Sequence, residues 1–189
     1  MVLDQNYFQQ DDVVFLAKDL IGSRFHTQID GAHCVGVVTE TEAYEGVTDK
    51  ASHAYGGRFT SRTAVMYEPG GIAYIYFCYG MHFLFNIVTA KRGTPHAVLI
   101  RGMIPIEGIK TMQNRRGLHI PFREIANGPA KLTKAMGIDG RYNGTLLEEG
   151  HIWFDKNDKI AGHIEATKRI GIDYAGEDTF LPYRFVWNP

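Results

Sequence analysis

The stretch IAYIYFCYGMHFLFNIVTA, residues 72–90, constrains the fold more than any other part of the chain. It is rich in aromatic and β-branched residues, which favour strands, and Tyr79-Gly80 interrupts it near its middle. The pattern predicts two strands joined by a tight hairpin. Phe77, Tyr79 and Met81 would lie at the hairpin tip, where a core is hard to reach. Large apolar side chains at such a place are typical of an interaction surface.

Shorter predicted elements flank this hairpin. They are helices over 13–20, 106–116 and 129–136, strands over 24–29, 34–44, 97–105, 151–154 and 183–187, and a further strand within 162–172. Asp11 and Asp12 are the expected caps of the first helix, Pro105 is expected to close the strand over 97–105, and Gly137 follows the last helix. Because few strands alternate with long helices, we expect a single α+β domain over residues 1–189 with a mainly antiparallel sheet.

Composition and short motifs exclude several classes of protein. The 189 residues are 44% hydrophobic and 22% charged, as in a globular domain, and no apolar run approaches the roughly 20 residues of a membrane span. The N-terminus lacks a secretory pattern, and the eight histidines and two cysteines lack metal-site spacing. We therefore expect no metal, no other cofactor and no membrane partner. The expected location is intracellular, cytoplasmic at the nucleoid in a bacterium or nuclear in a eukaryote.

Charge is distributed unevenly along the chain, although the net charge is only -1. Residues 50–134 hold 12 Lys/Arg and 3 acids, whereas the remainder holds 8 Lys/Arg and 18 acids. A basic middle between acidic ends suits a face that binds nucleic acid. Four basic residues in predicted loops are candidates for contacts with phosphates: Arg58, Arg62, Lys91 and Arg92.

The motif TETEAYEG, residues 39–46, carries the first candidates for chemistry. In an extended strand Glu40, Glu42 and Tyr44 share one face, because alternate side chains point the same way. Two acids beside an aromatic ring fit either a solvated strand edge or a carboxylate held over a flat substrate. Alternation alone does not rank the two glutamates.

The aromatic hairpin and the acids together indicate one chemistry. A wedge on a basic surface can open a base step in DNA, and aromatic rings can stack on a base that has left the duplex. A carboxylate can then activate water and stabilise the electron-poor sugar as the base departs. The combination predicts cleavage of an N-glycosidic bond without a lysine nucleophile.

Several long motifs support this prediction by resemblance. They are ETEAYEG, DKASHAYGGRFTSR, MYEPGGIAYIYFCYGMHFLFN, AVLIRGMIP and NGPAKL, followed by TKRIGIDYAGE and YRFVW near the end of the chain. In this order and at this spacing they resemble the alkyladenine (3-methyladenine) DNA glycosylase family. The similarity is nearly continuous over residues 37–137 and weakens over 139–160. It implies a curved antiparallel sheet with a protruding hairpin.

The resemblance also implies roles for individual residues. The general base is the glutamate before Ala-Tyr, which is Glu42, and Glu40 is a supporting acid. Arg101 would help to position the nucleophilic water. The remaining implied roles are base stacking by Tyr44, His53 and Tyr76, discrimination against guanine by Asn86, and intercalation by Tyr79.

We therefore expect a monofunctional DNA glycosylase, a monomer without lyase activity, that removes alkylated or deaminated purines from double-stranded DNA through the minor groove. Two alternatives stay open on the residues alone. One is a non-catalytic module that binds nucleic acid through the hairpin, and the other is a hydrolase of free nucleosides. The sequence does not rank 3-methyladenine, 7-methylguanine, hypoxanthine and ethenoadenine as substrates.

Overall fold

The computed structural model describes residues 1–117, 119–148, 150–156 and 161–188. Its strands are β1 (Arg24–Ile29), β2 (Ala32–Tyr44), β3 (Ile72–Cys78), β4 (His82–Thr89), β5 (His96–Glu107), β6 (Ile152–Asp155), β7 (His163–Thr167) and β8 (Arg184–Asn188). Its α-helices are α1 (Gln5–Phe8), α2 (Val13–Asp19), α3 (Ile109–Arg116) and α4 (Pro129–Met136). Short 3-10 helices lie at Tyr55–Gly57, Ala64–Tyr67, Phe122–Glu124, Gly140–Tyr142 and Asp173–Phe180. Within the described residues, no helix is long and apolar enough to cross a membrane.

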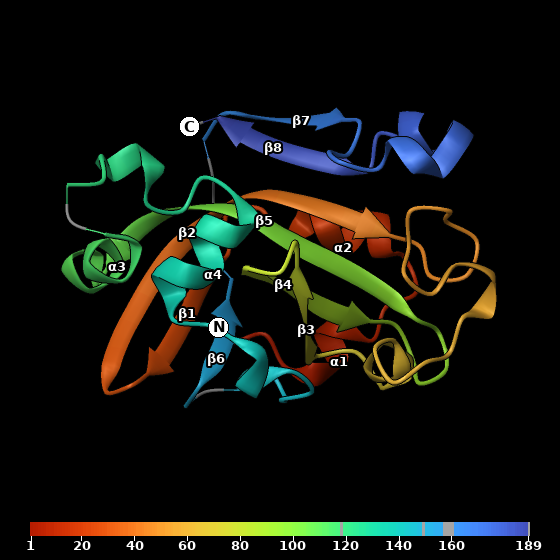
Figure 1. The fold of residues 1–189 in the computed structure, drawn as a ribbon, viewed down its shortest axis with the longest axis horizontal. Coiled ribbons are helices and arrows are strands. Elements are labelled where there is room, and N and C mark those ends of the chain that lie inside the picture. Colours follow the sequence, from red (N-terminus) through yellow and green to blue (C-terminus); the bar gives the residue numbers. More distant parts are fainter. Residues whose placement is uncertain (118, 149, 157–160, 189) are drawn as a thin grey trace.

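The strands form one open, eight-stranded sheet. Its order is β3-β4-β5-β2-β1-β6, and β8 joins it by pairing with β2 while β7 pairs with β8 (Figure 1). All pairings between the strands of the described chain are antiparallel. The prediction of an α+β fold with a mainly antiparallel sheet is therefore confirmed.

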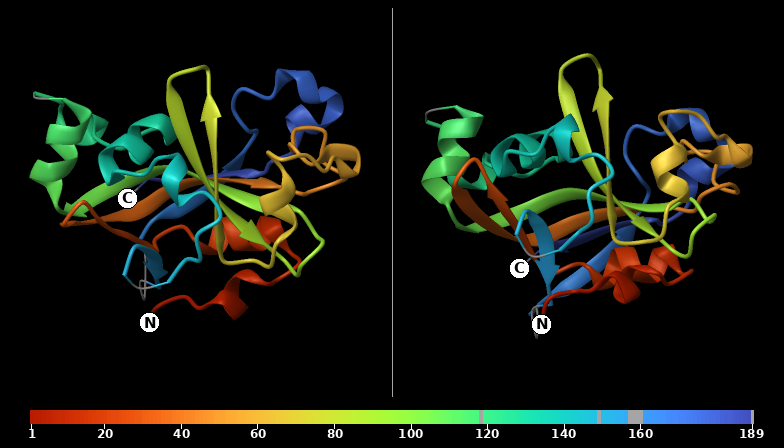
Figure 2. Two further views of the ribbon diagram at one scale, coloured as in Figure 1. Left: turned by 60° about the horizontal axis from the view of Figure 1, so that its bottom comes forward. Right: turned by 90° about the horizontal axis from the view of Figure 1, so that it is seen from below.

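The helices cover the sheet on two sides. The short helices α1 and α2 lie on one side, and α3, α4, the β3–β4 hairpin and the 3-10 helix Asp173–Phe180 lie on the other (Figure 2). Helix α2 packs against β2 and β5, and α4 packs against β4 and β5. In the main core the Phe25 ring stacks on Phe154 at 4.4 Å and on Phe85 at 5.0 Å between centroids. This core fixes the sheet that carries the polar residues described below.

The predicted helix boundaries follow from their caps. Asp12 accepts the N–H of Phe15 at 2.8 Å and so satisfies one free donor at the start of α2. Helix α4 begins at Pro129, where a missing N–H costs nothing, and ends at Gly137 in the left-handed conformation (φ 79°). Both helices are confirmed, whereas the short helix α1 was not predicted.

The end of β5 differs from the prediction. We expected Pro105 to close the strand, but β5 continues to Glu107 and α3 begins only at Ile109. Pro105 lies opposite Gly36 at a shift in the β2–β5 register. A proline is tolerated at such an irregularity because the regular ladder does not need its N–H.

The hairpin predicted from residues 72–90 is confirmed and stands out from the sheet (Figure 2). Cys78 pairs with His82, so the tip is the three-residue loop from Tyr79 to Met81. Tyr79 has a left-handed backbone (φ 53°), which costs a residue with a Cβ about 1 kcal/mol or more. Its side chain is 86% exposed. The fold therefore holds a large aromatic ring in solvent on a strained backbone.

A β-bulge shapes the middle of the β2–β5 pair. Glu40 lies opposite Gly102 and Thr41 lies opposite Ile100, so Arg101 has no direct partner in the ladder. Bulges of this kind re-aim a side chain and recur beside active sites. Here the bulge turns Arg101 toward the two glutamates of β2.

Candidate active site

A cavity of about 220 Å³ lies beside the hairpin, over β4 and β5. Its wall also includes residues of the loop after β2 and of the segment after β7. Six residues predicted from the sequence line it, namely Tyr44, His53, Tyr76, Tyr79, Asn86 and Arg101. These six side chains come from β2, from the loop after it, from the β3–β4 hairpin and from β5.

Glu42 lies behind this wall and its side chain is completely buried. Its Oε1 accepts the N–H of Ile170 at 2.8 Å, and its Oε2 accepts the hydroxyl of Tyr44 at 2.8 Å. The Nη1 of Arg101 lies 3.4 Å from the same Oε2. Two donors and a cation therefore satisfy a carboxylate that is buried away from water.

The hydroxyl of Tyr44 is a permanent donor to this carboxylate. Burial and the neighbouring charge of Glu42 raise the pKa of Tyr44 well above its ordinary value. Tyr44 therefore keeps its proton, and its hydrogen bond to Oε2 persists across the physiological pH range.

Arg101 is held between the two glutamates of β2. Burial acts to lower the pKa of Arg101, but Glu42 and Glu40 outweigh it and raise the pKa, so the guanidinium stays charged. Its Nε donates to Oε1 of Glu40 at 2.7 Å, and the Nε of Arg184 donates to the same oxygen at 2.6 Å. Glu40 thus holds Arg101 through a different nitrogen from the one that lies near Glu42.

Three aromatic side chains meet on the hairpin side of the cavity. The hydroxyl of Tyr74 lies 2.8 Å from Nδ1 of His53, and the His53 ring contacts Tyr76 edge-on at 4.6 Å between centroids. Burial and the charges of Arg62 and Arg58 lower the pKa of His53 to about 4. His53 is therefore neutral at physiological pH and behaves as a polar aromatic ring.

Asn86 is part of the cavity wall and is almost fully buried. Its Nδ2 donates to the carbonyl of Tyr74 across the β3–β4 pair at 3.1 Å. This bond fixes the orientation of the amide at the cavity wall.

The four predicted phosphate contacts divide into two pairs. Arg62 covers the Tyr76 ring at 4.9 Å and lies 3.3 Å from Nε2 of His53, and the exposed Arg58 is close enough to affect that histidine. Lys91 and Arg92 instead lie in the β4–β5 loop, at the opposite end of β4 from the hairpin tip. Arg92 is also paired with Glu68 at 2.7 Å. Of these four residues, Arg58 and Arg62 are the two that lie near His53, which lines the cavity.

The chain is similar in sequence to known proteins. The sequence model of the family described as methylpurine-DNA glycosylase (MPG) matches residues 6–189. The chain belongs to this family. It is 47% identical over 188 residues to a Chlamydia felis protein named "Putative 3-methyladenine DNA glycosylase", with 99% of this chain and 96% of the relative covered. A Shouchella clausii protein of the same name is 47% identical over 184 residues, covering 97% and 91%.

Membership of the methylpurine-DNA glycosylase family places the chain among hydrolases of DNA repair that act on alkylation damage. The family match also covers the stretches TKRIGIDYAGE and YRFVW near the end of the sequence. These stretches supply Ile170 and Arg184, whose contacts with the glutamates of β2 were not predicted. The signal was present as a faint match, but only the fold brings these residues to β2.

Replacing Glu40 by Gln should lower the free energy of unfolding by about 2 kcal/mol, because two partly buried arginines then lose a charged acceptor. Thermal denaturation of the purified variant measures this loss. Glu68→Gln is the matched control, since its partner Arg92 is largely exposed and such pairs contribute little. Equal melting temperatures for the two variants would remove the supporting role assigned to Glu40.

Proposed function

We propose that this chain is a monofunctional DNA glycosylase that hydrolyses the N-glycosidic bond of alkylated or deaminated purines taken out of duplex DNA. The observation that carries the proposal is the buried carboxylate of Glu42 beside Arg101, which itself lines a cavity together with several aromatic rings. The proposed unit is a single domain over residues 1–189, acting as a monomer on one duplex. It would act where the DNA is, in the bacterial cytoplasm or the eukaryotic nucleus.

Water activation is the role proposed for Glu42. A water beside its carboxylate would give up a proton as it attacks the sugar carbon, and the negative charge would also stabilise the electron-poor sugar. Arg101, which stays charged, would orient that water and hold the carboxylate in place. Among the described residues that line the cavity there is no lysine, so the structure supports attack by water over attack by an amine.

Base binding is the role proposed for Tyr44, His53 and Tyr76. Stacking of a purine on the face of Tyr76 that Arg62 now covers would require Arg62 to leave that ring. The freed Arg62 would then be available to a backbone phosphate. Asn86 would crowd the exocyclic amine of guanine and so spare the normal base.

The hairpin tip is proposed to enter the minor groove. Tyr79 and Met81 are 86% and 67% exposed, and Tyr79 also lines the cavity. A side chain in this place can fill the gap that a flipped base leaves in the stack. A cationic base such as 3-methyladenine then leaves readily, whereas hypoxanthine must be protonated first.

Base release from an oligonucleotide duplex that contains one hypoxanthine or 3-methyladenine tests the proposal. The expected products are the free base and an intact strand with an abasic site. Binding without release would favour the non-catalytic module. Equal turnover of the free nucleoside would favour the nucleoside hydrolase, although the exposed aromatic tip argues against it because a nucleoside gives the tip nothing to intercalate.

Duplex binding should weaken steeply with salt. Phosphate contacts by Arg58 and Arg62 predict a slope of about -1.8 in log affinity against log salt, or roughly a 12-fold loss between 50 and 200 mM. Fluorescence anisotropy with a labelled duplex measures the slope.

Two variants test which arginines cause this salt dependence. Arg58→Gln should reduce the slope by about one half, since it removes one phosphate contact. Arg92→Gln is the control and should leave the slope unchanged, because Arg92 is paired with Glu68 and lies away from the tip. A flat wild-type profile contradicts the proposed basic face.

A further inference from the structure

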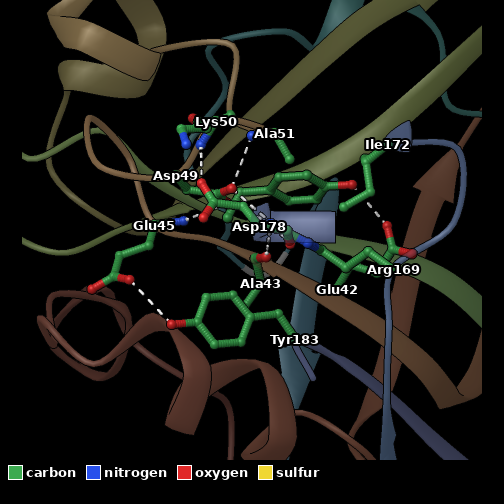
Figure 3. A network of polar contacts seen from close by, with 12 residues as sticks. Glu42, Ala43, Glu45, Asp49, Lys50, Ala51, Arg169, Ile172, Asp178 and Tyr183 are labelled. Atoms are coloured by element: carbon green, nitrogen blue, oxygen red, sulfur yellow. Dashed lines mark hydrogen bonds and ion pairs between the residues drawn. The ribbon is translucent and has the colours of Figure 1, made fainter. Parts of the chain in front are cut away.

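A buried ion pair joins the segment after β7 to the loop after β2. The Nη2 of Arg169 donates to Oδ1 of Asp49 at 2.8 Å and its Nη1 donates to Oδ2, so the pair is bidentate (Figure 3). The two side chains are 0% and 1% exposed. Asp49 also accepts the N–H of Glu45 and the N–H of Ala51, which fixes the carboxylate within its own loop.

Arg169 touches both groups that donate to Glu42. Its Nη1 donates to the carbonyl of Ala43 at 2.9 Å, and its guanidinium lies 4.8 Å from the centre of the Tyr44 ring. Its chain neighbour Ile170 gives its N–H to Oε1 of Glu42, while Tyr44 gives its hydroxyl to Oε2. One guanidinium therefore sets the position of the donors on both sides of a single carboxylate.

Stability alone does not account for such a pair. Taking two charges out of water is costly, and apolar residues of similar size often stabilise a fold as well or better. What the pair adds is a fixed geometry, because a bidentate arginine allows one arrangement of the two loops. That arrangement is the one in which the Ile170 N–H points at Glu42.

We propose that Arg169 and Asp49 are positioning residues for Glu42. The pair locks the Ile170 N–H and the Tyr44 hydroxyl onto the two carboxylate oxygens, so that the carboxylate keeps one orientation toward the water it activates. This inference rests on the proposed glycosylase function, and neither Arg169 nor Asp49 needs to touch the substrate.

Single-turnover base release by the full chain tests the proposal, with saturating enzyme and a duplex that contains one hypoxanthine. Arg169→Lys keeps the charge but loses the planar fork that bonds Asp49 and Ala43. Its maximal rate should fall on the order of 10- to 100-fold, as misplaced catalytic groups typically produce. Duplex affinity should stay within about threefold of wild type, because DNA contacts are unchanged.

The pH–rate profile separates positioning from general destabilisation. The acidic limb should move to higher pH in Arg169→Lys, since the carboxylate holds its charge less well when its donors are displaced. Arg115→Lys is the matched control: Arg115 also donates to backbone carbonyls, those of Ile29 and Ala135, but has no contact with the Glu42 network. It should lower the melting temperature and leave the limb in place.

Asp49→Asn extends the test from the other side of the pair and carries it if Arg169→Lys melts below the assay temperature. Asp49→Asn should show the same fall in rate and the same shift of the limb. The double variant should be no slower than the slower single variant, because coupled residues are not additive. A wild-type rate and profile in a folded variant, or an equal loss of rate in Arg115→Lys, overturns the positioning role. Failure of the wild-type protein itself to release a base would instead refute the proposed function.

Discussion

Replacement of Glu42 by Gln is expected to abolish base release while duplex binding is retained. A general base contributes roughly 10²- to 10⁴-fold, and Gln cannot take a proton from water. Gln has the same shape, so it can still accept the N–H of Ile170 and pair with Tyr44. Single-turnover release measures the first effect, and anisotropy with the same duplex measures the second.

Glu45→Gln is the control for this experiment. Glu45 is also an acid near the end of β2, but its Oε2 accepts the hydroxyl of Tyr183 instead of facing the Arg101 side. It should release the base at close to the wild-type rate. A wild-type rate in Glu42→Gln, or an equal loss in both variants, would remove Glu42 from the proposed role.

Replacement of Tyr79 by Ala is expected to lower release from duplex DNA about 100-fold and release from a single strand only a few-fold. Unstacking a base costs a few kcal/mol, and a wedge that offsets about 2.7 kcal/mol of this cost changes the rate about 100-fold. A single strand has no stack to fill. Parallel assays on the two substrates measure the ratio.

Two further variants control for size and exposure. Tyr79→Phe keeps the ring and should keep most of the duplex activity. Phe15→Ala removes another exposed aromatic ring, 51% exposed on α2 and on the other side of the sheet, and should alter neither assay. Equal losses on duplex and single strand in Tyr79→Ala would make Tyr79 a packing residue.

The parts of this fold that the sequence predicted are those that depend on neighbours in the chain. The hairpin follows from β-forming residues around Tyr79-Gly80, and α4 follows from Pro129 and Gly137 at its two ends. Alternation put Glu40 and Glu42 on one face of a strand, and the structure confirms it, since both contact Arg101.

The remaining features depend on contacts between distant segments. The bulge at Arg101 is a shift in the pairing of β5 with β2, and the residues of β5 alone do not predict it. Asp49 and Arg169 are 120 positions apart in the sequence. Nothing in the residues around Arg169 indicates which acid it pairs with. The basic residues of one stretch of sequence are likewise separated in the fold. Arg58 lies near His53 of the cavity, whereas Lys91 lies in the loop at the other end of β4.

Strand β8 and the segment before it make the surroundings of both β2 glutamates depend on residues that are translated long after β2. Ile170 donates a hydrogen bond to Glu42 and Arg184 donates one to Glu40, although both glutamates lie on β2, far earlier in the sequence. A premature stop codon just after Thr167 would leave most of the sheet encoded but deprive both glutamates of these bonds. During synthesis the contacts of Glu42 and Glu40 with Ile170 and Arg184 can form only after these two later residues have left the ribosome.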